Sequence, residues 1–123
     1  MENLKDNVGL LRKRIKDPNL TFEAFKLGRR TKSDIVTVYV KGIIDESIVD
    51  EARKRIQAID IDDAVSASQI AQLISDSPNS IFPLYQVTER PDKVVASLLD
   101  GRLAILIDGT PDSVLVPGTL TML

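Results

Sequence analysis

Two nearly continuous apolar runs constrain the fold of this chain more than any other feature of its sequence. Residues 35–40 form a mostly β-branched run, and residues 103–107 are apolar throughout. A strand that faces water on one side alternates apolar and polar residues, whereas a strand covered on both faces does not. The two runs therefore predict buried strands, with helices packed on one or both faces of their sheet.

Four other segments have helical periodicity, and three more read as strands. Strands 20–27 and 34–41 are expected to pair antiparallel, and strands 103–107 and 114–116 to form a hairpin across the turn at 108–112. Strands that helices separate are expected to run parallel, joined by right-handed crossovers. The predicted helices are 2–16, 46–59, a short one that starts at Ser66 or Ser68, and 91–100, and the predicted strands are 20–27, 34–41, 81–87, 103–107 and 114–116.

This order of elements predicts an α/β fold with an α+β tendency. We expect a mixed β-sheet of about five strands with about four helices packed on it. The 123 residues contain no repeat and no interdomain linker, so they fit a single domain spanning residues 1–123. A chain of this length can bury a core without disulfides or a structural metal.

Helical spacing also predicts how each helix begins, ends and faces the core. Asp45 is the predicted N-cap of the second helix, and Glu51 and Arg55 form an i,i+4 pair on its solvent face. Pro91 and Gly101 are placed to begin and end the fourth helix. The predicted buried stripes are Leu4, Val8, Leu11 and Ile15; Ile48, Ala52, Ile56 and Ile59; Ile70, Leu73 and Ile74; and Val94, Val95, Leu98 and Leu99.

The residue types that are missing exclude several kinds of chemistry. The chain has no histidine and no cysteine, which excludes a Ser–His or Cys–His nucleophile and a zinc site of nitrogen and sulfur ligands. It also lacks the glycine-rich phosphate-binding motifs. Asp60, Asp62 and Asp63 lack the spacing and the glycine of a calcium loop, so a solvated helix end is the favoured interpretation.

The remaining carboxylates suggest no catalysis either. Asp108 and Asp112 bracket a turn, where they are expected to cap backbone amides. An enzyme that uses Asp and Glu as acid and base is the weakest alternative, because no facing pair of carboxylates is recognisable. We therefore predict no catalytic residue, no metal ligand and no cofactor.

The charge pattern bears on partners. Sixteen basic and 18 acidic residues give a net charge of −2, which argues against a nucleic-acid partner. Arg12, Lys13, Arg14 and Lys16 follow one another at the end of the first helix, where they complement the helix dipole. A solvated basic face is the favoured interpretation, and a contact with anionic lipid or with a partner is the alternative.

No apolar run approaches the roughly 18–20 residues that cross a bilayer. The first residues also lack the pattern of a secretory leader. Taken alone, the chain is expected to be soluble and cytoplasmic.

Two charged corners are candidate interaction sites. Glu89 and Arg90 stand just before the helix that Pro91 begins, and they exceed what capping needs. A salt-bridged corner is the structural interpretation, and an interface or ligand contact through the Arg90 fork is the functional one. Arg29 and Arg30 follow a turn glycine, where a solvated turn competes with docking to carboxylates or to another subunit.

Four segments resemble one known family. Residues 89–111, ERPDKVVASLLDGRLAILIDGTP, look like a signature of the A subunit of GerA-type spore germinant receptors. Residues 12–20, 27–34 and 40–62 also resemble that family, so the likeness covers essentially the whole chain. Family members are several times longer and carry membrane-spanning helices, and they have more apolar residues where this chain has Asp112 and Ser113. Family members also carry a further soluble subdomain upstream of a helix like residues 2–16. The resemblance thus implies an excised second half of the soluble N-terminal region.

The resemblance implies a receptor in the spore inner membrane, assembled from A, B and C subunits, that senses small nutrients such as amino acids. This domain would lie on the cytoplasmic, spore-core side as a non-catalytic signalling and assembly domain. Its expected partners are the upstream subdomain, the membrane domain and the B and C subunits. The alternative is a domain that binds the germinant or a small effector at the carboxyl ends of parallel strands, near Gly42 and Asp108.

Overall fold

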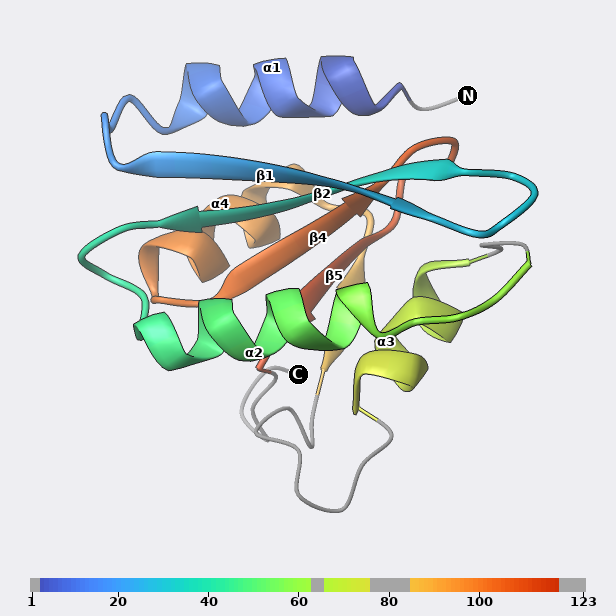
Figure 1. Ribbon diagram of the computed structural model, residues 1–123. Coiled ribbons are helices and arrows are strands. Elements are labelled where there is room, and N and C mark those ends of the chain that lie inside the picture. The colour runs from blue at the N-terminus through green and yellow to red at the C-terminus, as the bar shows by residue number, and fades with distance from the viewer. Residues whose placement is uncertain (1–2, 63–65, 76–84, 118–123) are drawn as a thin grey trace.

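The computed structural model describes residues 3–62, 66–75 and 85–117. Within them the chain forms four helices and a five-stranded sheet, which confirms the predicted fold class (Figure 1). None of these helices is long and apolar enough to cross a membrane. The elements are α1 (Leu4–Arg14), β1 (Leu20–Leu27), β2 (Ser33–Val40), α2 (Glu46–Gln57), α3 (Ala67–Ser75), β3 (Gln86–Thr88), α4 (Pro91–Leu99), β4 (Leu103–Ile107) and β5 (Ser113–Val116).

Every ladder in the described sheet is antiparallel, and its strand order is β1-β2-β4-β5-β3. The predicted pairs β1–β2 and β4–β5 are confirmed, whereas the expected parallel pairing is wrong. The register explains why: β3 and β4, which α4 separates, point the same way, but β5 lies between them. The expectation of parallel pairing applies to strands that are neighbours in the sheet. Here β5, the second strand of the final hairpin, occupies the place between β3 and β4 and pairs antiparallel with both.

The sheet is covered on both faces, as the two apolar runs predict. One core cluster packs α2 and α3 against Ile35, Ile105 and Val114. The other packs α1 and α4 against the alternate residues of the same strands, such as Val38 and Leu106. Figure 1 shows α1 above the sheet and α2 and α3 below it.

Most predicted buried residues are in these clusters, with two corrections. Leu73 is 40% exposed and Leu99 is 51% exposed. In α3 the buried face consists of Ala67, Ile70, Ala71 and Ile74, so small alanines pack where a leucine was expected. In α4 the short hydroxyl side chain of Ser97 is buried, and Leu99 turns outward at the last helical position.

The helix ends follow the predicted chemistry. The carboxylate of Asp45 accepts a hydrogen bond from Ser47 N at 2.9 Å. After α4, Gly101 N donates to Leu98 O and Arg102 N donates to Ser97 O, which is a Schellman motif. Gly101 takes the left-handed conformation that this motif needs, with φ +83°.

The Glu51–Arg55 pair forms at 2.6 Å, but it is not on a solvent face. Both side chains are mostly buried, and Arg55 Nη1 also donates to Ile74 O at 2.9 Å. The pair therefore joins α2 to α3, because α3 packs beside the turn of α2 that carries Arg55.

The strand predicted over residues 81–87 is described only in part, as β3. The ladder to β5 spans Gln86–Thr88, and residues 81–84 of the predicted strand lie outside the described residues. Asp63 likewise lies outside them.

Candidate functional site

The two predicted corners lie at opposite edges of the sheet. Arg29 and Arg30 are in the β1–β2 turn, and Glu89 and Arg90 connect β3 to α4. Because β1 and β3 are the two edge strands, the fold does not bring these four residues into one site.

The β1–β2 turn is tied to the segment that follows α2. Arg29 N donates to Ile61 O at 2.9 Å, and Arg30 N donates to Asp62 O at 3.0 Å. Arg29 Nε lies 3.3 Å from Asp60 Oδ1 and 3.2 Å from Asp62 Oδ1. The guanidinium of Arg29 is thus paired within the chain. Asp60 and Asp62 both contact this guanidinium, so they are not a facing pair of carboxylates.

Arg30 has a different environment, because its side chain is exposed and has no ion pair among the described residues. Exposed ion pairs such as those of Arg29 contribute little to stability. Of this corner, Arg30 is the cation that remains available to a partner.

The second corner contains a local ion pair. Arg90 Nη2 lies 2.6 Å from Asp92 Oδ2, and its hydrogen bonds hold the pKa of Asp92 below its ordinary value. Arg90 N donates to Thr88 Oγ1 at 3.1 Å, which fixes the turn into α4. Both charged side chains of the pair are more than half exposed, so the pair shapes the surface without being part of the core.

Glu89 lines the rim of a cavity of about 150 Å³ between α1, α4 and the sheet. The floor is apolar and includes Leu11, Val94 and Leu106, which are nearly fully buried. Asn7 and Ser113 add polar groups to the lining. This arrangement can hold a small molecule or a side chain that presents a cation to Glu89 and an apolar part to the floor.

The small-molecule site predicted near Gly42 and Asp108 loses its basis. It assumed neighbouring parallel strands with a common carboxyl edge, and the described sheet has no such pair. Asp108 Oδ1 instead accepts a hydrogen bond from Leu4 N at 3.1 Å, so it caps the start of α1. This confirms the capping role expected of Asp108, with a partner that is distant in sequence.

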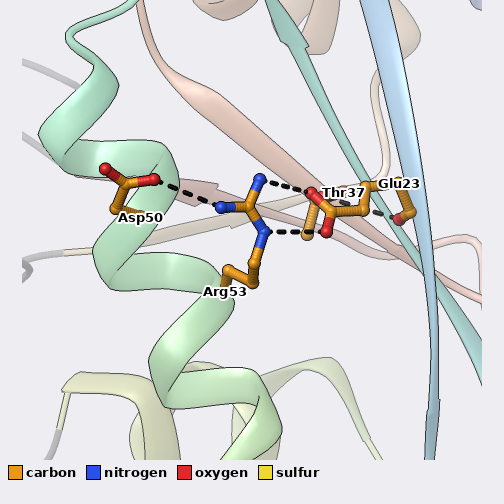
Figure 2. Close-up of polar contacts among 4 residues, drawn as sticks. All are labelled: Glu23, Thr37, Asp50 and Arg53. Carbon is orange, nitrogen blue, oxygen red and sulfur yellow. Dashed lines mark hydrogen bonds and ion pairs between the residues drawn. The ribbon is translucent and has the colours of Figure 1, made fainter.

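Sequence reasoning missed a polar network on the α2 face of the sheet (Figure 2). Arg53 Nε and Nη2 donate to both carboxylate oxygens of Glu23 at 2.8 and 3.0 Å, and Nη1 donates to Asp50 at 3.2 Å. The buried Thr37 donates to Glu23 O at 3.5 Å. The Glu23 hydrogen bonds raise the pKa of Arg53, and the carboxylate reinforces burial in raising the pKa of Tyr39.

This network fastens α2 to the edge strand β1, which is a structural role. The i,i+3 spacing of Asp50 and Arg53 was a visible cue, but only the register could place Glu23 opposite them. No group of three or more Asp or Glu side chains that could hold a metal occurs in the part of the chain that the structure describes.

Comparison with known proteins gives one consistent result. The family model described as "Bacillus/Clostridium GerA spore germination protein" matches residues 1–123. Spore germination protein B1 of Bacillus subtilis (strain 168) is 45% identical over 98% of this chain and 25% of its own length. Spore germination protein KA of the same organism is 43% identical over 94% of this chain and 21% of its own length. This chain therefore spans about a quarter of the length of these curated relatives.

A solved structure has the same fold. The crystal structure of the N-terminal domain of the A subunit of the Bacillus megaterium spore germinant receptor GerK3 matches with a TM-score of 0.76 and 40% sequence identity. The match covers 100% of this chain and 98% of that one.

Proposed function

Because this chain belongs to the Bacillus/Clostridium GerA spore germination protein family, we propose that it is a non-catalytic signalling and assembly domain of a germinant receptor A subunit. The observation that carries the proposal is the structural match to the N-terminal domain of an A subunit, which covers 100% of this chain and 98% of that domain. In this proposal the domain is part of a longer subunit of the spore inner membrane and lies on its spore-core side. The upstream subdomain, the membrane domain and the B and C subunits are its partners.

The surface of the domain supports an assembly role. Glu89 and Arg90 are exposed at a corner whose backbone is already fixed by Thr88 and Pro91. We therefore expect both charges to be dispensable for folding. Glu89 makes no ion pair among the described residues, and the exposed pair of Arg90 with Asp92 can exchange for a partner's carboxylate. Arg30 offers a second contact of the same kind at the other edge of the sheet.

Co-isolation of receptor subunits tests this proposal. Glu89→Ala/Arg90→Ala in the full-length protein is expected to reduce recovery of the B and C subunits from detergent-solubilised spore membranes. Glu46→Ala/Lys54→Ala removes an exposed pair of the same charges from α2 and is the matched control. Equal recovery with both variants would count against this corner as an assembly contact.

The cavity beneath Glu89 favours a second function, binding of a small molecule. The ligand would be a germinant or effector with a cationic group for Glu89 and an apolar part for Leu11 and Leu106. Calorimetric titration with amino acids and sugars is expected to give heat with one class, and Glu89→Gln is expected to abolish it. No heat at millimolar ligand would exclude this second function.

A further inference from the structure

The end of α1 carries a basic cluster that makes no ion pair within the part of the chain that the structure describes. Arg12, Lys13, Arg14 and Lys16 are all exposed. Among the described residues, ion pairs are made by basic side chains elsewhere and by none of these four. The basic residues that do form them are Lys26, Arg29, Arg53, Arg55, Arg90 and Arg102.

The topology brings a fifth cation and two exposed aliphatic side chains to the same end of the molecule. Lys41 N donates to Asn19 O, which places Lys41 beside the start of β1. Ile43 is 45% exposed, and Leu99 is 51% exposed at the end of α4. The turn after α4, which contains Gly101, contacts the β2–α2 loop, which contains Ile43. A Cβ added at Gly101 would lie 3.2 Å from Ile43 O. Figure 1 shows the end of α1, the start of β1 and the β2–α2 loop together at the left of the molecule.

The cluster also borders an apolar hollow. An open hollow of about 400 Å³ is lined by Arg12 and Lys16 together with Ile15, Leu20 and Phe22. The Arg12 guanidinium carbon lies 4.9 Å from the centroid of the Phe22 ring, a cation–π contact that holds this cation over the hollow. Cations here therefore stand directly beside apolar surface.

Nearby carboxylates do not cancel this charge. Asp17, which follows Lys16, is one negative charge at this end, and Asp100 pairs with Arg102. Asp45 and Glu46 follow Ile43 by two and three residues and are also exposed, but the five cations outnumber these carboxylates. The α1 end is therefore net basic on a chain whose net charge is −2.

We propose that this end of the molecule, formed by the five cations with Ile43 and Leu99, docks on an anionic phospholipid bilayer surface. Cations beside exposed aliphatic side chains are the combination by which peripheral surfaces bind the headgroup region. Because these five cations gather at one end of a chain whose net charge is −2, the remaining residues are net negative. Binding therefore has one orientation, with the α1 end toward the lipid. This inference goes beyond the proposed function and does not depend on receptor assembly.

Vesicle sedimentation tests the proposal on the 123-residue chain. We expect it to sediment with vesicles of equal parts phosphatidylglycerol and phosphatidylcholine at low salt, and to be released as salt rises. Each basic residue near such a surface is worth about a fivefold change in partitioning. Lys13→Gln/Lys16→Gln should therefore lower partitioning about 25-fold.

Two controls make the result decisive. Lys32→Gln/Lys54→Gln removes the same charge from the β1–β2 turn and from α2, and should leave partitioning nearly unchanged. Circular dichroism should show unchanged unfolding for both variants, because all four side chains are exposed. Equal binding to pure phosphatidylcholine, or an equal loss with both variants, would overturn the proposal. Absence of binding to either vesicle would also overturn it and leave an acidic protein partner as the occupant.

Discussion

At the scale of single residues, the fold depends on a few positions whose chemistry is not interchangeable. Gly101 combines a left-handed backbone with a close approach to Ile43 O, and Arg53 has both arms of its fork on Glu23. The first position was predictable from sequence as a helix terminator. The second was not, because nothing local reveals that Glu23 in a strand faces a helix thirty residues later.

Gly101→Ala is expected to destabilise the domain by about 1–3 kcal/mol, because its φ of +83° strains any L side chain. The added Cβ would also crowd Ile43 O at 3.2 Å. Urea unfolding followed by circular dichroism measures the change.

Gly9→Ala is the matched control for that substitution. Gly9 lies within α1, and a Cβ there meets nothing within 4 Å, so alanine should stabilise the helix by up to about 1 kcal/mol. A shift of the unfolding midpoint in the same direction for both substitutions would contradict a conformational requirement for glycine at position 101.

Among the secondary-structure elements, the helix ends were predictable from sequence, and the pairing of the strands was only partly predictable. Asp45, Pro91 and Gly101 mark helix ends through backbone chemistry, which acts over three or four residues. The direction of pairing depends on which strands become neighbours. The insertion of β5 between β3 and β4 is a property of the whole sheet, so the parallel β3–β4 pair expected from the crossover rule does not form.

Asp45→Ala tests the N-cap of α2 through the pH dependence of the domain's stability. The hydrogen bonds from Ser47 hold the pKa of Asp45 below its ordinary value of about 3.9. A carboxylate with a lowered folded-state pKa adds stability above its unfolded-state pKa and loses it as pH falls through the folded-state pKa. The variant should therefore unfold more easily at pH 7, and its difference from the parent should narrow below about pH 4. A difference that stays constant from pH 7 to pH 2 would argue against capping by the carboxylate.

At the scale of the whole molecule, the two apolar runs predicted a sheet covered on both faces, and the clusters on its two sides confirm this. The candidate site was less predictable. Sequence singled out Glu89 and Arg90 because they exceed the needs of capping, yet only the fold shows that Glu89 lines a cavity while Arg90 pairs with Asp92. The cavity itself arises where α1 and α4 approach each other, and no local pattern encodes that approach.

In the proposed function the Glu89–Arg90 corner serves signalling and not folding. This role is tested most directly by measuring, for Glu89→Ala/Arg90→Ala, both the thermal unfolding of this chain and the nutrient-triggered germination of spores that carry the change in the full-length protein. We predict unfolding within a degree or two of the parent, since exposed substitutions shift stability by about 0.5 kcal/mol or less, together with slower germination. Germination at the parental rate, or loss of the folded state, would contradict the claim.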